Sequence, residues 1–448
     1  MPESLSFQYV LTPDGLRENQ TITIGNEGRI SRIADANAAI CRPGLALPGI
    51  PNAHSHSFQR ALIGYGEIPN FKKGDENFWS WRQSMYALAN QLDEKQLYGI
   101  ARQAFMEMLQ AGFTSVAEFH YLHHDKEGTA TLAMLDAIIL AARDTGIRLR
   151  LLPVLYMRGG FTLPAQPEHY RFVIASLSQY CKLLEHCNKH VATGVAPHSL
   201  RAVPIENIPK LLHYAEAILG KNFPVHIHIA EQKKEVQDCL SAHHASPVQL
   251  LADSVPLTSQ WNLIHATHIN GREMDLLARA HAQVVLCPYT EAYLGDGVFP
   301  AAQFFQSGGR FALGTDSNTR IDALGEMRFL EYNQRLISRK RSRLASSQGI
   351  GHSLWDMTAK AGAKAVQFTV GELQTGHFAD IVVLDTKRAP LNGLPVERML
   401  DAAVIGGARD LVKEVYVGGK QVVNGQQHVF ADEIEKDFAT TMRSLKMV

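Results

Sequence analysis

Two short motifs in this sequence each contain two histidines separated by one residue, HSH at 54–56 and HIH at 226–228. Side chains at positions i and i+2 of a strand share one face, so each pair could direct both imidazoles at a single ion. Histidine is the commonest protein ligand for metals, and 20 of the 448 residues are histidines. Each pair alone could equally be two hydrogen-bonded core histidines, so further ligands are needed to support a metal site.

Such residues stand where other apolar, strand-like runs end. Six of eight such runs deliver a histidine or a carboxylate at the C-terminal end. These residues are His54 and His56, Glu118 and His120, His198, His226 and His228, His265, and Asp316. Twenty randomly placed histidines would rarely give this arrangement. The coincidence therefore argues against separate core histidines and for one shared site.

The elements that must position these side chains alternate along the middle of the chain. Apolar runs at 45–49, 113–119, 148–156, 191–197, 223–229, 261–266, 283–287 and 310–315 predict strands, and stretches such as 93–112 and 274–282 predict helices. Eight strands alternating with helices predict an α/β protein with a (β/α)8 TIM-like barrel over 48–374; an open doubly wound sheet is the alternative. The barrel is favoured because its catalytic residues come from the C-terminal ends of several strands.

Both ends of the chain are β-rich. Short strand-like runs occur at 7–11, 21–25 and 29–33, and again at 379–385 and 413–425, the last with a Gly-Gly turn. We therefore expect a small β-sandwich domain built from both termini, residues 1–47 and 375–430, followed by a C-terminal helix at 431–448.

A metal site follows from the strand ends. Asp316 would end the last strand, which lies beside the first strand in a closed barrel. Together with His54, His56 and a histidine of the second pair, it would offer three imidazoles and one carboxylate, a set that suits Zn²⁺ or another borderline divalent ion. Position along the strand leaves His226 and His228 as rivals for the third imidazole.

Four of these segments resemble strand motifs of the amidohydrolase superfamily: PGIPNAHSH (48–56), HIHIAEQ (226–232), IHATH (264–268) and LGTDSN (313–318). The resemblance covers nearly the whole chain and implies the ligands His54, His56, His228 and Asp316. Binuclear members bridge two ions with a carboxylated lysine at the end of the fourth strand. The corresponding segment of this chain, VATGVAPHS (191–199), contains no lysine. The resemblance thus implies one Zn²⁺ per chain, although Fe²⁺ or Mn²⁺ could use the same ligands.

Three residues near these ligands fit hydrolysis of a C=N bond. A divalent ion can lower the pKa of bound water toward neutrality. Glu231 could accept the water proton and pass it to an imine nitrogen, Asp316 could take the next proton, and His265 could hold the attacking oxygen. Glu231 could instead be only an acidic residue at a helix N-terminus. We expect a hydrolase that releases ammonia.

Other segments resemble one member family, the N-formimino-L-glutamate deiminases of histidine catabolism. They are SFQRALIGYGE (57–67), NFWSWRQSMY (77–86), AEFHYLHHD (117–125), APHSLRAV (196–203) and CPYTEAYLGDG (287–297). Purine and triazine deaminases of the superfamily usually carry Ser-Asn after that Cys-Pro, whereas this chain has Thr290 and Glu291. A related aminohydrolase acting on guanine or another amino-heterocycle is the alternative, and an inactive metal-binding scaffold is a third.

N-formimino-L-glutamate has two carboxylates, which call for cationic partners. We expect Arg82 and Arg201, in loops beyond strand ends, to bind them, because a guanidinium fork suits a carboxylate. Gln59 and Tyr121 could hold the formimino nitrogens or a carboxylate. His198, three residues before Arg201, completes the expected substrate-binding set.

Composition excludes several other classes. Lys plus Arg and Asp plus Glu both number 44, which gives no support to nucleic-acid binding, and we interpret SRKRSR (338–343) as a solvated face. No run approaches the ~18 apolar residues of a membrane span. Five cysteines without a CxxC pair and an N-terminus unlike a signal peptide predict a cytoplasmic protein. The superfamily resemblance implies a homodimer.

Overall fold

The computed structural model describes residues 3–65, 67 and 78–446. Gly66 and Asn77, which belong to two of the motifs above, lie outside the described residues. Among the described residues, no helix combines the length and the apolar character needed to cross a bilayer.

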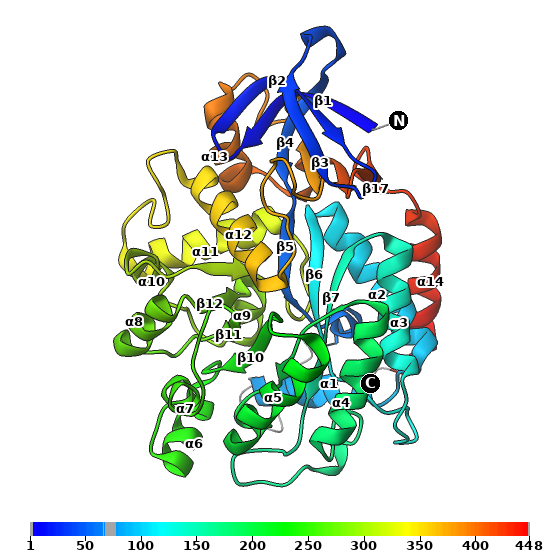
Figure 1. The fold of residues 1–448 in the computed structure, drawn as a ribbon, viewed down its shortest axis with the longest axis vertical. Helices are drawn as coiled ribbons and strands as arrows, with labels where there is room; N and C mark the ends of the chain where they lie inside the picture. Colours follow the sequence, from blue (N-terminus) through cyan, green and yellow to red (C-terminus); the bar gives the residue numbers. More distant parts are fainter. Residues whose placement is uncertain (1–2, 66, 68–77, 447–448) are drawn as a thin grey trace.

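Strands from both ends of the chain form one mixed sheet, seen at the top of Figure 1 in blue and orange. Its order is β17-β16-β15-β14-β4-β1-β2-β3. The strands are β1 (Glu3–Thr12), β2 (Gly15–Ile24), β3 (Ile30–Asp35), β4 (Arg42–Pro48), β14 (Ile381–Leu384), β15 (Val412–Val417), β16 (Lys420–Asn424) and β17 (Gln427–His428). Phe7 and Ile22 from the N-terminal strands share a buried cluster with Ile381 and Tyr416 from the C-terminal strands. The expected strands at both ends therefore meet in one core.

The apolar run at 45–49 corrects one prediction. It belongs to β4 of the mixed sheet and not to the first strand of the parallel part, which is β5 (Ile50–Ser55). Gly49 separates the two strands, and a Cβ there would lie 2.2 Å from the Thr114 hydroxyl oxygen. Both strands are buried along most of their length, so hydrophobic pattern alone cannot separate them.

The middle of the chain forms two parallel sheets. One contains β5, β6 (Phe113–His120), β7 (Arg148–Leu155) and β8 (Ala192–Thr193), with β9 (Ala196–Pro197) also paired to β7. The other contains β10 (Val225–Ile229), β11 (Trp261–His265), β12 (Gln283–Leu286) and β13 (Phe311–Leu313). Parallel bridges join them on both sides, Val195 with Val225 and Ser55 with Asp316. The C-terminal ends of these strands consequently meet around one site.

Helices follow most of the parallel strands. The predicted helix at 93–112 is α2 (Glu94–Gln110), which begins with a capping box between Asp93 and Gln96. The others are α1 (Phe78–Ala89), α3 (Ala133–Thr145), α4 (Leu177–His190), α5 (Ile208–Leu219), α6 (Lys233–His243), α7 (Pro247–Ser254), α8 (Gly271–Ala280), α9 (Pro288–Leu294), α10 (Ala301–Gln306), α11 (Ala323–Ser338), α12 (Ile350–Val366), α13 (Val396–Gly406) and α14 (Ala431–Ser444).

The C-terminal helix α14 lies against α2 on one side of the molecule (Figure 1). Arg102 of α2 forms ion pairs with Glu433 at 2.8 Å and Asp437 at 3.0 Å. At the end of α11, Arg339, Lys340 and Arg341 are exposed. The solvated interpretation of the basic run is therefore confirmed.

Candidate active site

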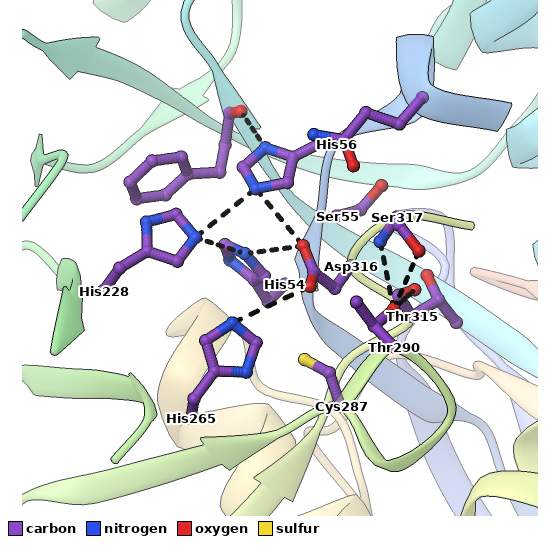
Figure 2. Close-up of polar contacts among 12 residues, drawn as sticks. His54, Ser55, His56, His228, His265, Cys287, Thr290, Thr315, Asp316 and Ser317 are labelled. Atoms are coloured by element: carbon purple, nitrogen blue, oxygen red, sulfur yellow. Dashed lines mark hydrogen bonds and ion pairs between the residues drawn. The ribbon is translucent and has the colours of Figure 1, made fainter. Parts of the chain in front are cut away.

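Four predicted ligands converge at the C-terminal ends of the parallel strands (Figure 2). His54 and His56 come from the end of β5, His228 from β10, and Asp316 from the loop after β13. The Nε2 atom of His228 lies 3.1 Å from that of His54 and 3.4 Å from that of His56. The Oδ1 atom of Asp316 lies 3.4 Å from His54 Nε2 and 3.3 Å from His56 Nε2. All four side chains are buried.

These four separations, 3.1–3.4 Å, are close to those between neighbouring ligands of one bound ion. Metal–ligand distances of about 2.0–2.1 Å, the range for Zn²⁺, give tetrahedron edges of about 3.3–3.4 Å. Burial lowers the pKa of all three histidines, and neighbouring imidazoles lower those of His54 and His228 further. A lowered pKa favours the neutral ring, the form in which histidine binds a metal. Without a shared ion, four donor atoms would have no reason to lie this close together in an apolar core.

Backbone carbonyls fix the orientation of two of the rings. His56 Nδ1 donates to the Phe119 carbonyl at 2.9 Å, and His228 Nδ1 donates to the His198 carbonyl at 3.0 Å. Each Nε2 lone pair is thereby directed at the site, the usual arrangement around a metal. His226 instead bonds through Nε2 to the Ala365 carbonyl at 3.0 Å. It lies two residues deeper in the strand, so His228 is the histidine that joins the cluster.

Glu231 and His265 stand beside Asp316. His265 Nε2 lies 3.8 Å from Glu231 Oε1 and 3.7 Å from Asp316 Oδ2. Asp316 thus presents one carboxylate oxygen to the ligand histidines and the other to His265. Burial raises the pKa of Glu231 to about 7, a value suited to taking up and releasing a proton near neutral pH.

The backbone at these positions is unusual. His265 has φ +64°, Asp316 has φ +46° and Asn318 has φ +57°, in the left-handed region that residues other than glycine adopt sparingly. Such conformations persist where surrounding contacts enforce them, and they cluster at functional sites. Asn318 supplies part of that enforcement, because its side-chain amide donates to the carbonyls of His56 and Asp316 at 3.1 and 3.0 Å.

A pocket opens onto this cluster. The predicted Gln59, Tyr121, His198 and both arginines line it, together with Glu231, His265 and three of the four ligands. Gln59 Nε2 donates to the Tyr121 hydroxyl at 2.9 Å. Its Oε1 atom is buried without a protein partner among the described residues. The structure therefore brings together every residue predicted to bind substrate.

Arg82 and Arg201 are the cations of this pocket. The expectation that Arg82 lies in a loop is wrong, because it lies on α1; Arg201 follows β9 and is 9% exposed. The two guanidinium carbons lie 4.6 and 5.5 Å from the Trp79 ring centroid. Burial lowers the pKa of Arg82, and the charge of Arg201 lowers it further. Neither arginine forms an ion pair with a carboxylate within the part of the chain that the structure describes.

Sequence reasoning missed several pocket residues. Tyr86, Tyr156 and Phe172 line the same pocket, but each comes from an apolar run that looks like ordinary core. Glu291, noted only as a departure from the Ser-Asn pattern, lies 3.3 Å from His265 Nδ1. This departure from the Ser-Asn pattern is the signal in the sequence that points to Glu291.

Comparison with known proteins places this site in a family. Residues 45–422 match the amidohydrolase family. The chain belongs to the amidohydrolase family. Among curated relatives of this amidohydrolase, formimidoylglutamate deiminase of Pseudomonas aeruginosa is 39% identical over 98% of both chains. The 5-methylthioadenosine/S-adenosylhomocysteine deaminase of Shouchella clausii is 27% identical, with 86% of this chain and 83% of that one covered.

Solved structures resemble this amidohydrolase along its whole length. A crystal structure described as an amidohydrolase from Brucella melitensis superimposes with a TM-score of 0.90 at 38% identity, covering 98% of this chain and 99% of that one. An adenosine deaminase from Xanthomonas campestris with bound zinc gives a TM-score of 0.80 at 20% identity, covering 99% of this chain and 98% of that one. The second likeness concerns the fold alone.

Proposed function

We propose that this amidohydrolase is a zinc-dependent N-formimino-L-glutamate deiminase that produces N-formyl-L-glutamate and ammonia in histidine degradation. The observation that carries the proposal is that one pocket contains both a ligand cluster and two arginines that have no carboxylate partner among the described residues. The proposed substrate has a hydrolysable C=N carbon and two carboxylates. The near-full-length likeness to the Pseudomonas aeruginosa deiminase supports the same assignment.

The four-ligand cluster would hold one Zn²⁺ per chain, since imidazole and carboxylate donors suit this ion. When bound, such an ion supplies Lewis acidity that makes water a nucleophile near neutral pH. Proton transfer then belongs to the side chains. Glu231 takes a proton from the attacking water and delivers it to the imino nitrogen. Asp316 takes the second proton and delivers it to the departing nitrogen as ammonia leaves.

His265 and the outer pocket orient the reactants. His265 Nε2 faces the same space as Glu231 and Asp316, so its N–H can stabilise the negative charge that develops on the attacking oxygen. Arg82 and Arg201 would each bind one carboxylate of the substrate, through paired N–H···O bonds. Gln59, Tyr121 and His198 line the same pocket and would bind the formimino nitrogen or a carboxylate.

The architecture that positions these groups is also part of the proposal. We infer that the two parallel sheets form one (β/α)8 barrel, because bridges between Val195 and Val225 and between Ser55 and Asp316 join them at both seams. The barrel would span 48–374. The shared core of the mixed sheet supports a β-sandwich formed by 1–47 and 375–430, with 431–448 as a C-terminal extension.

We further propose a homodimer that works in the cytoplasm. Helix α11 exposes 77% of Leu336 and 62% of Ile337, an apolar face that a second copy could cover. All five cysteines are unpaired, as thiols are in a reducing compartment.

The deciding experiment measures ammonia release by the purified protein. N-formimino-L-glutamate, N-formimino-glycine and guanine are compared as substrates, and zinc, iron and manganese are quantified in the same sample. We expect the first compound to have the highest kcat/KM, because it alone has two carboxylates, with about one zinc per chain. Faster ammonia release from guanine would instead support the aminohydrolase alternative, and no release from any compound would support the scaffold.

A further inference from the structure

Glu291 is a buried carboxylate that the mechanism above does not use. It lies in the first turn of α9 and is 5% exposed. Its Oε1 atom accepts a hydrogen bond from the backbone N–H of Cys287 at 2.9 Å and lies 3.3 Å from His265 Nδ1. One oxygen therefore joins the start of α9 to the ring of His265. No other hydrogen bond to Nδ1 is present among the described residues.

The ring that Glu291 contacts needs such support. His265 is the last residue of β11, and both it and Ala266 have a left-handed backbone, with φ +64° and +49°. The strand pairing that fixes the rest of β11 ends here. A half-turn of the ring about its Cβ–Cγ bond would place Cδ2 where Nδ1 lies and Cε1 where Nε2 lies. The contact at Nδ1 therefore decides whether Nε2 or a ring carbon faces the reacting groups.

The opposite side of the ring faces the site. Nε2 lies 3.8 Å from Glu231 Oε1 and 3.7 Å from Asp316 Oδ2. A hydrogen bond at one imidazole nitrogen fixes both the proton on that nitrogen and the direction of the other nitrogen. Figure 2 shows His265 directed at Asp316 from the side of the cluster opposite His56.

We propose that Glu291 is a positioning residue, which holds His265 with Nδ1–H donating to its carboxylate and with Nε2–H directed at the attacking oxygen. The proposal rests on the deiminase function for its kinetic consequence only. Without the acceptor at Nδ1, the ring would turn, and its contact with the developing charge would be lost in the transition state. Substrate binding through the arginines would remain, so the loss would fall on kcat and leave KM nearly unchanged.

Three substitutions separate the parts of this role. Glu291→Gln keeps a side-chain oxygen, now that of an amide, which can accept from the Cys287 N–H and from His265 Nδ1. Glu291→Leu keeps the approximate size but accepts from neither donor. Glu291→Asp keeps the charge, but its side chain is one methylene shorter and falls short of the ring.

Glu326 provides a matched control. It is also fully buried, and its Oε2 atom accepts from the backbone N–H of Tyr289 at 3.0 Å, in the same first turn of α9. It has no hydrogen bond or ion pair with His265 among the described residues. Glu326→Leu therefore reports what the loss of a buried carboxylate does to this turn without changing the ring.

The test uses zinc-loaded, full-length protein with ¹⁵N-labelled histidine, and His265→Asn assigns the signal. We expect long-range ¹H–¹⁵N spectra to show a protonated Nδ1 in the wild type, Glu291→Gln and Glu326→Leu. We expect Glu291→Leu and Glu291→Asp to lose it. This measurement needs no substrate, so it remains informative if the deiminase function is wrong.

With N-formimino-L-glutamate, we expect kcat to fall at least about tenfold in Glu291→Leu and Glu291→Asp, with KM within about threefold of wild type. Glu291→Gln should restore most of kcat. A protonated Nδ1 together with wild-type kcat in Glu291→Asp would overturn the proposal. This result is decisive even if Glu291→Leu fails to fold. Equal losses of kcat in Glu291→Leu and Glu326→Leu would also overturn it, since they would indicate a structural role only.

Discussion

At the scale of single residues, Glu231 is the proposed proton carrier. Burial raises its pKa to about 7, so it can take up and release a proton near neutrality. Glu231→Gln keeps the size but cannot accept the proton. We expect kcat to fall at least ~100-fold, the usual scale of general acid–base assistance, while zinc content by elemental analysis stays unchanged. Turnover close to wild type would remove Glu231 from the mechanism.

Arg82 and Arg201 are the residues that should define substrate choice. We expect Arg82→Met and Arg201→Met each to lower kcat/KM for N-formimino-L-glutamate by roughly 100-fold, because a desolvated carboxylate loses its partner. Lysine should not restore the rate fully, since a point charge lacks the guanidinium fork.

Two measurements serve as controls for the arginine variants. Zinc content should not change, because neither arginine is a proposed ligand. Arg328→Met should leave kcat/KM near that of wild type, because Arg328 donates to the Gly407 carbonyl away from the pocket. Wild-type kinetics in both pocket variants would show that the carboxylates bind elsewhere.

At the scale of elements, the seam between β5 and β13 brings ligands from the two ends of the parallel part together. Asn318 is fully buried there, and its side chain donates to Ser55 Oγ and to the carbonyls of His56 and Asp316 at 3.0–3.1 Å. Its Oδ1 atom accepts from the Thr315 hydroxyl at 2.6 Å. One amide thus connects the ends of two strands that supply three ligands.

Asn318→Leu tests this connection. The change keeps the approximate volume but removes the hydrogen bonds to Ser55, His56 and Asp316. It also leaves the buried Thr315 hydroxyl without its acceptor, at a cost of about 1–3 kcal/mol. We expect the free energy of unfolding to fall by at least about 1 kcal/mol and zinc affinity to fall about tenfold or more. Chemical denaturation and competition with a zinc chelator measure these effects. Unchanged zinc affinity would show that the seam does not orient the ligands.

At the scale of the whole molecule, the proposed ion joins both parallel sheets, because His54 and His56 end β5 and His228 belongs to β10. Binding to the folded state alone stabilises it by about 2.7 kcal/mol at a free zinc concentration of 100 times Kd. We therefore expect chelation to lower Tm and added zinc to restore it.

The double variant His54→Ala and His56→Ala provides the control for chelation. It should bind no zinc, and its Tm should be insensitive to both chelator and added metal. A chelator that lowers the Tm of this variant as much as that of wild type would contradict the assignment of the site.

The proposed dimer is a second property of the whole molecule. Leu336→Glu places a charge on the exposed apolar face of α11, where burial against a second copy would be costly. We expect sedimentation velocity to give a dimer for wild type and a monomer for the variant, with Gln303→Glu on α10 as a surface control. A monomeric wild type, or a variant that remains dimeric, would show that this face is not the interface.

Much of the site could be predicted from the sequence alone. Spacing and strand ends identified His54, His56, Asp316 and the pair containing His228, because a strand presents alternate residues on one face and parallel strands end together. The strands at both chain ends were also predictable from local pattern. The family resemblance then favours His228 over His226 as the third imidazole ligand.

Only the tertiary structure decided the rest. The division of 42–55 into β4 and β5 depends on which neighbours each half pairs with, since both halves are apolar. The structure places Arg82 on a helix. It also brings together residues that are distant in sequence, Arg82 with Arg201 and Glu291 with His265. Local pattern determines elements and the faces they present. Which side chains meet across elements is set by packing, and packing is a property of the folded chain.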